Sequence, residues 1–475
     1  MDHSAISKFL VSRFGGGYSN SAYYTAISSW LTWYKGYDES FHRVLNQNGK
    51  QDRWRIMYQL RMAKRVAEDW ASAVSSEPPI IVVSSSTLKP SIFIQGSKNT
   101  TGVLGSNNFN ELLSLCLERM FALGTSSVVQ QLENIDCNLQ GEIVDGTRGR
   151  IKVVSCDAQN IIPMSYANGE IVDCAFISQT MKDNKMYYIL SVHKRESDGY
   201  VIYNIVLDSS YNTASYFPGM LPVIRTKCPY PLFEVFRTNI ANNIDLDSPL
   251  GMSVYANAID NLKSTDQAFD ACIRDVVTGQ RIILMNQCLL NTDDHGKTVV
   301  PQDAKQSYMW FFGDEASANI NEFIKEFAPK LNTNELDKEL QNQLNMLSFK
   351  CGLGTHYYNF DRSGGLTATE YSGERQDFVR NVRKMNISVS NGIARMVKTM
   401  LFLGRNILQN GVDDSAKVTV TMPDGIVEDD SKLMDLDLKL VEKGIMSKVE
   451  FRMKWFGESQ EEAVYKLSLV LPVST

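Results

Sequence analysis

The chain has 475 residues, 43% of them hydrophobic, which is enough to build about three domains of ordinary size. Its 54 acidic and 48 basic side chains give a formal net charge of −6 at pH 7. A protein that binds nucleic acid along its whole surface carries an excess of basic residues, so this composition disfavours tight nucleic-acid binding.

Neither a targeting segment nor a membrane span is predicted. The N-terminal residues lack a long apolar core before a small-residue cleavage site, and no window reaches about 18 uninterrupted apolar residues. Eight cysteines are scattered singly without a CxxC pair, which favours reduced, buried thiols in a cytosol.

A first helix is predicted from apolar side chains that recur at spacings of four and three: Ile56, Leu60, Ala63, Ala67 and Trp70. Its other faces carry five basic residues, Arg53, Arg55, Arg61, Lys64 and Arg65, together with Glu68 and Asp69. This basic surface either touches nucleic acid or is a solvated or intersubunit face. A second helix is expected over about 109–123, with Gly124 as its C-terminal stop.

From about residue 141 to 236 the sequence consists of short runs rich in Val, Ile and Tyr, separated by the turn-forming pairs NG, DN and DG. This pattern predicts an antiparallel β region.

The next helix is expected to end at Gly279, with Val254, Ala258, Leu262, Phe269, Ile273 and Val276 on one face. Asp266 and Asp270 stand four residues apart, so they share another face of this helix. As catalytic acids they lack a third partner, and we expect them to form an exposed acidic stripe.

Residues 280–330 are expected to form a small inserted α/β unit, with a β-like stretch, a polar turn and an aromatic cluster of Tyr308, Trp310, Phe311 and Phe312. A capping pattern at Asn332 and Glu335 then opens a helix that carries Leu336, Leu340, Leu344 and Leu347.

Residues 351–366 contain four glycines and predict a mobile loop, with an ordinary surface connection between helices as the alternative. The longest helix follows, from the capping pair Thr367 and Glu370 to about residue 403. After Gly404 come a short strand (KVTVTM) and two helices, over about 431–443 and 447–456.

Enzyme motifs are largely missing. Gly296-Lys297-Thr298 is the one phosphate-loop candidate, but Asn291 stands where a Walker A loop needs glycine. HExxH and GxSxG do not occur, and the five histidines are far apart in sequence. The sequence therefore predicts no catalytic, cofactor-binding or metal-ligating residues.

An ordered set of segments carries a resemblance that spans nearly the whole chain. YYTAISSWLTWYKGYDESFH and RMAKRVAEDWASAVSSEPPIIVV come first, followed by PLFEVFRTNIANNIDLDSPLGMSVYANAIDNLKSTDQAFD. GGLTATEYSGERQDFVRNVRKMN and GIMSKVEFRMKWFGESQEEA complete the set. Together these segments resemble the portal proteins of tailed bacteriophages, as typified by siphophages of Gram-positive hosts.

The resemblance implies an α+β portal fold with seven parts. These are a wing of N-terminal helices and antiparallel strands at 1–250, stem helices at 251–278 and 333–350, an α/β clip at 279–332, a channel (tunnel) loop at 351–366, the long wing-to-crown helix at 367–404, and the C-terminal wing and helical crown at 405–475.

The function that the resemblance implies is a non-enzymatic ring, dodecameric by the family rule, at one capsid vertex. Double-stranded DNA would pass transiently through it during packaging and ejection. Its implied partners are a terminase motor, a head-completion adaptor, and the major capsid and scaffolding proteins; no membrane and no cofactor are involved. The protein would be assembled in the host cytoplasm and end in the virion.

Two groups of site residues follow from this plan. The DNA channel would be lined by Asp266, Asp270, Tyr357, Tyr358, Phe360, Arg362, Gly364 and Gly365. Tyr308, Trp310, Phe311 and Phe312 would form a partner interface, with a local core under the two helices as the alternative. Two other functions stay open: a minor capsid or scaffold component without a channel, and a DNA-processing enzyme whose site is assembled from distant carboxylates.

Overall fold

The computed structural model describes residues 1–17, 20–48, 51–97, 100–167, 169–279, 282–286, 309–312, 324–359, 368–423, 430–444, 446–456, 463 and 466–467. The chain divides into two compact units, Met1–Pro423 and Asp424–Thr475.

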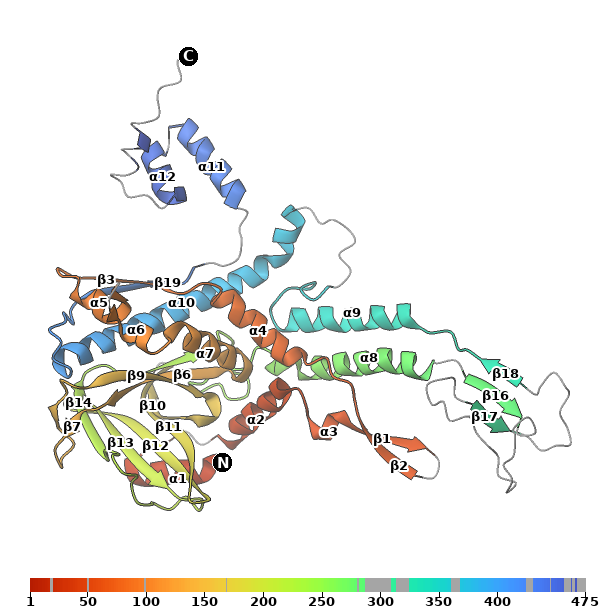
Figure 1. Cartoon of the computed structure of the whole chain (residues 1–475), viewed down its shortest axis with the longest axis horizontal. Helices are drawn as coiled ribbons and strands as arrows, with labels where there is room; N and C mark the ends of the chain where they lie inside the picture. The colour runs from red at the N-terminus through yellow and green to blue at the C-terminus, as the bar shows by residue number, and fades with distance from the viewer. Residues whose placement is uncertain are drawn as a thin grey trace, which may run out of the picture. The chain divides into compact units, whose positions relative to one another are not determined.

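Three helices open the first unit: α1 His3–Phe14, α2 Ser21–Lys35 and α3 Glu39–His42 (Figure 1). The side chains of Asp2, Asn20 and Asp38 cap them, because each accepts hydrogen bonds from backbone N–H groups that the helix leaves without partners.

A β-hairpin follows where the sequence predicted the start of a helix. Strand β1 Arg43–Asn48 pairs antiparallel with β2 Gln51–Ile56, and helix α4 begins only at Met62 and ends at Val74. The expectation that Arg53 and Arg55 belong to a basic helix is therefore wrong. The apolar spacing from Ile56 to Trp70 crosses the boundary between a strand and a helix.

The expected antiparallel β region is confirmed. Its larger sheet has the strand order β10-β11-β12-β13-β14, with bounds Ile161–Ala167, Glu170–Lys182, Lys185–Glu196, Gly199–Leu207 and Val223–Cys228. Neighbours in sequence are neighbours in this sheet. The tight turn at Asp183 and Asn184 has both residues at positive φ, as a two-residue hairpin turn requires.

A second sheet of order β15-β6-β9 (Phe233–Arg237, Thr125–Glu133, Arg150–Asp157) lies at the centre of the first unit. Helix α7 Phe109–Leu123 packs on it. Gly124 ends α7 at a φ of 84°, and a Cβ there would lie 2.4 Å from the carbonyl oxygen of Gly251, so this turn accepts only glycine.

The long predicted helix is confirmed as α10 Ala368–Asn406, 39 residues. It packs against β15, α4 and α5, and it buries Val389, Ile393 and Val397 completely. The Gln130 side chain donates a hydrogen bond of 3.0 Å to the carbonyl oxygen of Met396, which ties the helix to strand β6.

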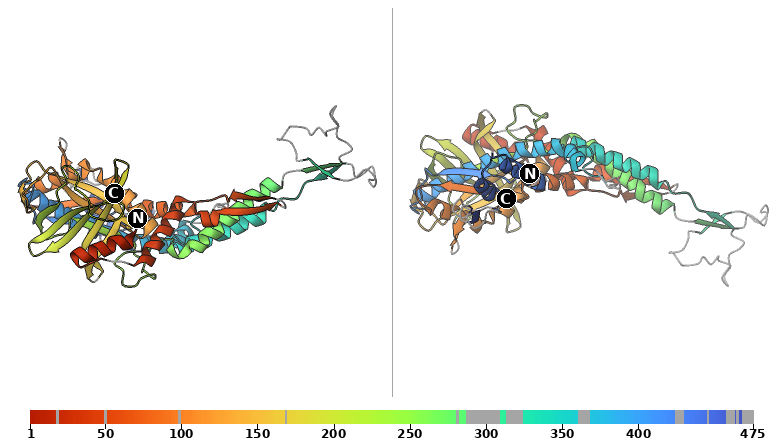
Figure 2. Two further views of the ribbon diagram at one scale, coloured as in Figure 1. Left: turned by 90° about the horizontal axis from the view of Figure 1, so that it is seen from below. Right: turned by 90° about the horizontal axis from the view of Figure 1, so that it is seen from above.

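Two antiparallel helices, α8 Ile259–Thr278 and α9 Thr333–Lys350, lie side by side (Figures 1 and 2). Helix α9 has the bounds that the sequence predicted. Helix α8 begins later than the expected residue 251, because residues 251–255 are buried as non-helical chain and Ala256–Ala258 form a 3₁₀ turn. The Tyr255 hydroxyl donates to the carbonyl oxygen of Trp30, which fixes this stretch in the core.

A three-stranded sheet is inserted between α8 and α9. Its central strand β16 Ile282–Asn286 pairs parallel with β17 Met309–Phe312 and antiparallel with β18 Ile324–Phe327. In the described part of this segment the structure contains strands, which are the β half of the expected α/β unit.

Several short elements complete the first unit. Strand β3 Ile80–Ser84 pairs antiparallel with β19 Lys417–Thr421, the expected late strand. The others are α5 Lys89–Gln95, β4 Gly96–Ser97, β5 Thr100–Thr101, α6 Val103–Ser106, β7 Asp136–Cys137, β8 Ile143–Asp145 and the 3₁₀ turn Ala158–Asn160.

The second unit contains the two predicted C-terminal helices, α11 Asp430–Glu442 and α12 Lys448–Phe456. The Trp455 indole donates a hydrogen bond of 2.9 Å to Asp437, which joins them. Over the described residues of the whole chain, no helix combines the length and the apolar character needed to cross a membrane.

Two isoleucines on α10 test the burial of this helix. Ile393 is fully buried and Ile387 is 64% exposed. We expect Ile393→Ala to lower the free energy of unfolding by about 2–5 kcal/mol, because it leaves a cavity in a close-packed core. The matched Ile387→Ala should change it by less than about 0.5 kcal/mol. Urea denaturation of the unassembled chain measures both, and equal losses would contradict the assigned burial.

Candidate functional site

The helix pair α8–α9 and its surroundings hold most of the expected site residues. Asp266 and Asp270 lie on α8, Tyr357 and Tyr358 follow α9, and Trp310, Phe311 and Phe312 lie in the inserted sheet. Phe360, Arg362, Gly364, Gly365 and Tyr308 lie outside the described residues.

Asp266 is buried, with 4% of its surface exposed. It accepts hydrogen bonds from Nε2 of His42, at 3.0 Å, and from the backbone N–H of Leu60, at 2.8 Å. On the other side of the ring, Nδ1 of His42 lies 2.8 Å from the backbone nitrogen and 3.1 Å from the carbonyl oxygen of Asp38, so both ring nitrogens have partners. This carboxylate therefore joins α8 to the chain on both sides of the hairpin.

Asp270 is 5% exposed and forms a two-pronged ion pair with Arg55, whose two terminal nitrogens lie 2.8 and 2.7 Å from its oxygens. The backbone N–H of Tyr58 adds a third hydrogen bond, of 3.0 Å. Burial by itself would raise the pKa of Asp270, but the hydrogen bonds from Arg55 and Tyr58 and the charge of Arg55 outweigh it and lower the pKa below its ordinary value.

These contacts correct the expectation of an exposed acidic stripe that lines a channel. Both carboxylates do share one face of α8, as their spacing indicated, but the β1–β2 hairpin covers that face. Their oxygens are used within the subunit. Asp266 and Asp270 thus anchor the hairpin and offer no free acidic surface to DNA.

The basic residues of α4 are also engaged within the chain. Lys64 pairs with Glu68 and Glu118, and Arg65 pairs with Asp69 at 2.9 Å. Partial burial would lower the pKa of Lys64, but its carboxylate partners outweigh this and raise the pKa above its ordinary value. Because these charges are neutralised locally, α4 is a poor surface for phosphate groups.

The turn that follows α9 packs against α4 and α10. The Trp70 indole donates a 3.0 Å hydrogen bond to the carbonyl oxygen of Cys351, and the Tyr358 hydroxyl donates one of 2.7 Å to Asp69. The ring of Tyr357 meets Tyr358 and Phe378 edge to face. Residues 351–359 are thus packed within the subunit, which contradicts a mobile loop over this stretch. That Tyr357 and Tyr358 contact DNA stays a prediction.

The Asp69–Tyr358 contact perturbs both groups. Burial raises the pKa of Asp69, against the opposing effects of Tyr358 and Arg65. Burial and the nearby Asp69 carboxylate raise the pKa of Tyr358. Tyr358 therefore stays a neutral hydrogen-bond donor at ordinary pH, which is a structural role.

The inserted sheet brings the expected aromatic residues onto one strand. Trp310, Phe311 and Phe312 lie in β17, in register with Leu284, Met285 and Asn286 of β16.

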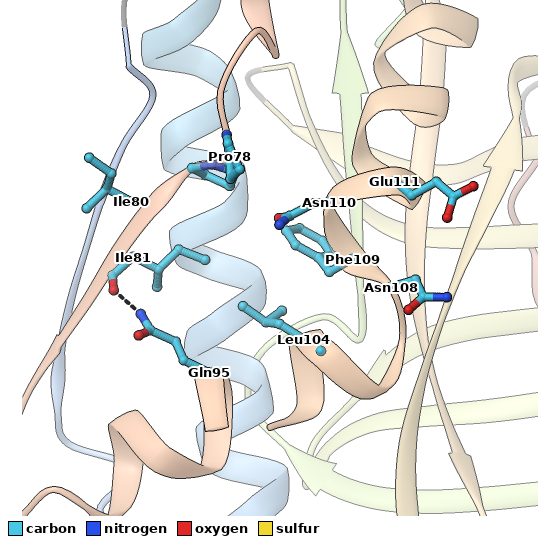
Figure 3. Close-up of a pocket in the computed structure, with 11 residues that line it drawn as sticks. Pro78, Ile80, Ile81, Gln95, Leu104, Asn108, Phe109, Asn110 and Glu111 are labelled. Atoms are coloured by element: carbon cyan, nitrogen blue, oxygen red, sulfur yellow. Dashed lines mark hydrogen bonds between the residues drawn. The ribbon is translucent and has the colours of Figure 1, made fainter. Parts of the chain in front are cut away.

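A surface cavity of about 680 Å³ lies between β3, α5, α6 and the start of α7 (Figure 3). In the view of Figure 3 its walls mix apolar side chains such as Ile81, Leu104 and Phe109 with polar ones, and the carboxylate of Glu111 points away from Gln95. Glu111 is the one titratable residue among its described lining residues, so the cavity lacks a combination for acid–base or nucleophilic catalysis.

No three His, Cys, Asp or Glu side chains converge as a metal site in the part of the chain that the structure describes. The seven cysteines described there are free, and burial raises the pKa of the thiols of Cys116 and Cys351 to about 12. Such thiols are poor nucleophiles at neutral pH.

Sequence reasoning missed His42 and Arg55, the partners of the α8 carboxylates. They are separated from Asp266 and Asp270 by 224 and 215 residues. A lone histidine and an arginine among several basic residues gave no signal of this pairing. An exposed acidic pair and a buried, paired one have the same spacing.

The architecture is an antiparallel helix pair that carries an inserted sheet and joins a mixed α+β body. A sequence profile described as "Phage portal protein, SPP1 Gp6-like" matches residues 18–464. The chain belongs to this phage portal protein family.

Solved structures give weaker likenesses. A chain of "Neck of native GTA particle computed with C12 symmetry" is 10% identical, with 82% of this chain and 88% of that chain covered and a TM-score of 0.40. A chain of "Neck of empty GTA particle computed with C6 symmetry" is 10% identical, with coverages of 83% and 88% and a TM-score of 0.38. A search of curated proteins finds no match.

The ion pair at Asp270 is testable by hydrogen exchange. We expect Asp270→Asn to leave Arg55 without its counter-charge and to speed amide exchange over residues 53–60 by on the order of 10-fold or more. The matched control is Asp260→Asn, whose side chain is 95% exposed on the same helix.

The same experiment has a pH signature. Because the pKa of Asp270 is lowered from 3.8 in the folded chain, its stabilising effect is complete above that value and is lost as pH falls through the lower folded value. Hairpin protection in the unsubstituted chain should decline below about pH 4, and Asp270→Asn should lack this component. If amide exchange over residues 53–60 at neutral pH were the same in Asp270→Asn as in Asp260→Asn, Asp270 would not anchor the hairpin.

Proposed function

We propose that this chain is the subunit of a portal ring at one capsid vertex, through which double-stranded DNA enters and leaves. The match of the portal family over residues 18–464 carries this proposal. The ring is non-enzymatic and dodecameric by the family rule, assembles in the host cytoplasm and ends in the virion. It docks a terminase motor during packaging and a head-completion adaptor afterwards, and it contacts the major capsid and scaffolding proteins.

The helix pair and the inserted sheet support a division of labour within this ring. Helices α8 and α9 are the stem, the segment 279–332 is the clip, and the β-rich body with α10 is the wing. A sheet inserted between two rigid helices is a compact module that can present side chains to a motor or adaptor without disturbing the body. Trp310, Phe311 and Phe312 are the proposed contacts, because aromatic residues are favoured at the centre of interfaces.

The overall charge suits a channel that lets DNA slide. A basic lining binds a duplex tightly through counterion release, whereas a chain of net charge −6 offers few sites where DNA would be held. The proposed DNA contact is the segment 360–366, where Arg362 supplies one cation per subunit and Phe360 supplies bulk. Gly364 and Gly365 permit backbone conformations that other residues resist.

Two rivals differ in what a purified sample would do. A minor capsid or scaffold component would share the phage setting but form no central hole. A DNA-processing enzyme would cleave DNA in the presence of a divalent metal.

The first test is an image of the purified protein. We expect negative-stain micrographs to show rings with a central hole, and mass measurement to give a single large oligomer without DNA cleavage in Mg²⁺. Compact particles without a hole would favour the minor capsid component, and metal-dependent cleavage would favour the enzyme.

The clip has its own test. Trp310 is predicted to contact both a neighbouring subunit and the motor or adaptor. Trp310→Ala should therefore weaken ring assembly in sedimentation and lower terminase capture in a pull-down assay by at least about 10-fold, as for an anchor residue of an interface. Tyr166→Ala, at an exposed position on β10, is the matched aromatic control. If Trp310→Ala captured terminase as well as the unsubstituted chain does, the alternative that Trp310 packs in a local core would be favoured.

The loop can be tested by stiffening it. Gly364→Pro with Gly365→Pro restricts the backbone without touching stem or wing, so rings should form while DNA packaging falls. Gly364→Ala with Gly365→Ala adds a side chain at each position without locking φ, so it separates the effect of the proline ring from that of a larger residue. If the double proline variant packaged DNA at the normal rate, the segment 360–366 would be an ordinary connection between helices.

A further inference from the structure

The β1–β2 hairpin turns a charged side chain toward the interior of the subunit and apolar side chains toward solvent. Along β2 and the residues after it, Arg55 and Met57 face the chain's interior, whereas Trp54, Ile56 and Tyr58 are 58, 62 and 48% exposed. Leu45, the register partner of Trp54 on β1, is 38% exposed. The buried face thus holds the ion pair with Asp270, and the apolar side chains point to solvent.

Exposed apolar side chains on one face of a hairpin indicate that another molecule covers this face. A two-stranded sheet in water is expected to turn its apolar face inward and its charged face outward, and a contiguous exposed apolar face marks an interaction site. Arg43 adds a cation to the same face, with its guanidinium carbon 4.9 Å from the centre of the Trp54 ring. We call Arg43, Leu45, Trp54, Ile56 and Tyr58 the hairpin face.

Helix α9 carries a second exposed stripe. Its residues Leu344 and Leu347 are fully buried, while Met346 and Phe349 are 55 and 65% exposed. Glu335, Glu339, Asn342, Met346 and Phe349 follow one another at spacings of four and three, so they share one side of the helix, away from the buried leucines. We call these five residues the α9 stripe.

The two surfaces lie on different sides of the stem. Helix α8 lies between α9 and the hairpin in Figures 1 and 2, and it contacts both, the hairpin through Asp266 and Asp270. We infer that the hairpin face of one subunit docks onto the α9 stripe of the next copy of this chain, an inference that rests on the proposed ring.

Composition and charge favour a second copy over another partner. Two dissimilar surfaces on different sides of one chain are what a head-to-tail interface needs, whereas a two-fold dimer uses one self-complementary patch. Both surfaces are apolar in part. Arg43 already pairs with Glu39 of its own subunit at 2.8 Å, but this exposed pair is a weak one and the arginine side chain stays 46% exposed. Its guanidinium can therefore also face the exposed Glu335 and Glu339 of the stripe on the next copy. Repetition of this contact closes a ring.

The test uses two double variants that damage one surface each. Trp54→Glu with Ile56→Glu alters the hairpin face, and Met346→Glu with Phe349→Glu alters the α9 stripe. Each alone should weaken self-association by on the order of 100-fold or more and give monomers, because two apolar anchors become charges. Leu139→Glu with Val144→Glu, two exposed apolar positions far from both surfaces in sequence, is the matched control and should still form rings.

Mixing the two damaged proteins is the decisive step. In a head-to-tail arrangement one intact hairpin face and one intact α9 stripe remain, so the mixture should give a one-to-one heterodimer that grows no further, measured by mass photometry or sedimentation. All samples should keep the far-UV circular dichroism of the unsubstituted chain, since the four positions are exposed.

Each outcome has one meaning. If the unsubstituted chain forms rings and either double variant does too, or if the mixture stays monomeric, the inferred contact is wrong while the proposed function stands. If the unsubstituted chain forms no ring under any condition that keeps it folded, the proposed function fails, and this contact fails with it.

Discussion

A buried carboxylate is tolerated only where hydrogen bonds and an opposite charge replace its water, and α8 buries two of them one turn apart. His42, Arg55 and the backbone N–H groups of Leu60 and Tyr58 supply what is needed. Each of these partners comes from the hairpin or its ends. The pairing therefore decides which face of the hairpin points inward, and with it which side chains are left for a neighbour.

Long-period patterns were read correctly from the sequence, and a boundary between two patterns was not. Helices α9 and α10 each keep one apolar stripe over many turns, so the spacing alone located them. The spacing from Ile56 to Trp70 also fits a helix, but Ile56 ends strand β2 and the chain is non-helical up to Met62. In this stretch the backbone N–H groups of Tyr58 and Leu60 donate to Asp270 and Asp266. The local pattern does not show these tertiary contacts.

The expected site residues were found on the right elements but in different surroundings. Asp266 and Asp270 share a helical face, as predicted, yet exposure depends on what covers that face, and the covering hairpin lies over 200 residues away in sequence. Tyr358 was predicted to lie in a mobile loop because residues 351–366 contain four glycines, whereas its hydroxyl donates a hydrogen bond to Asp69 on α4. Spacing reports which residues share a face, and only tertiary contacts report where the face points.

In the helix pair and its hairpin, polar contacts hold the subunit together and apolar side chains are left exposed. Charged and polar contacts work inside the subunit, where Asp270 and Arg55 fix the hairpin to α8. Apolar side chains such as Ile56 and Phe349 remain outside, where they lose water only when another copy arrives. A subunit built this way is orientated before it assembles, because its directional bonds are already satisfied internally. In the inferred contact, assembly then rests mainly on the burial of apolar surface, with Arg43 and the stripe glutamates at its edge. Apolar contact tolerates small rotations between neighbours better than a set of intersubunit hydrogen bonds does, since hydrogen bonds depend on angle.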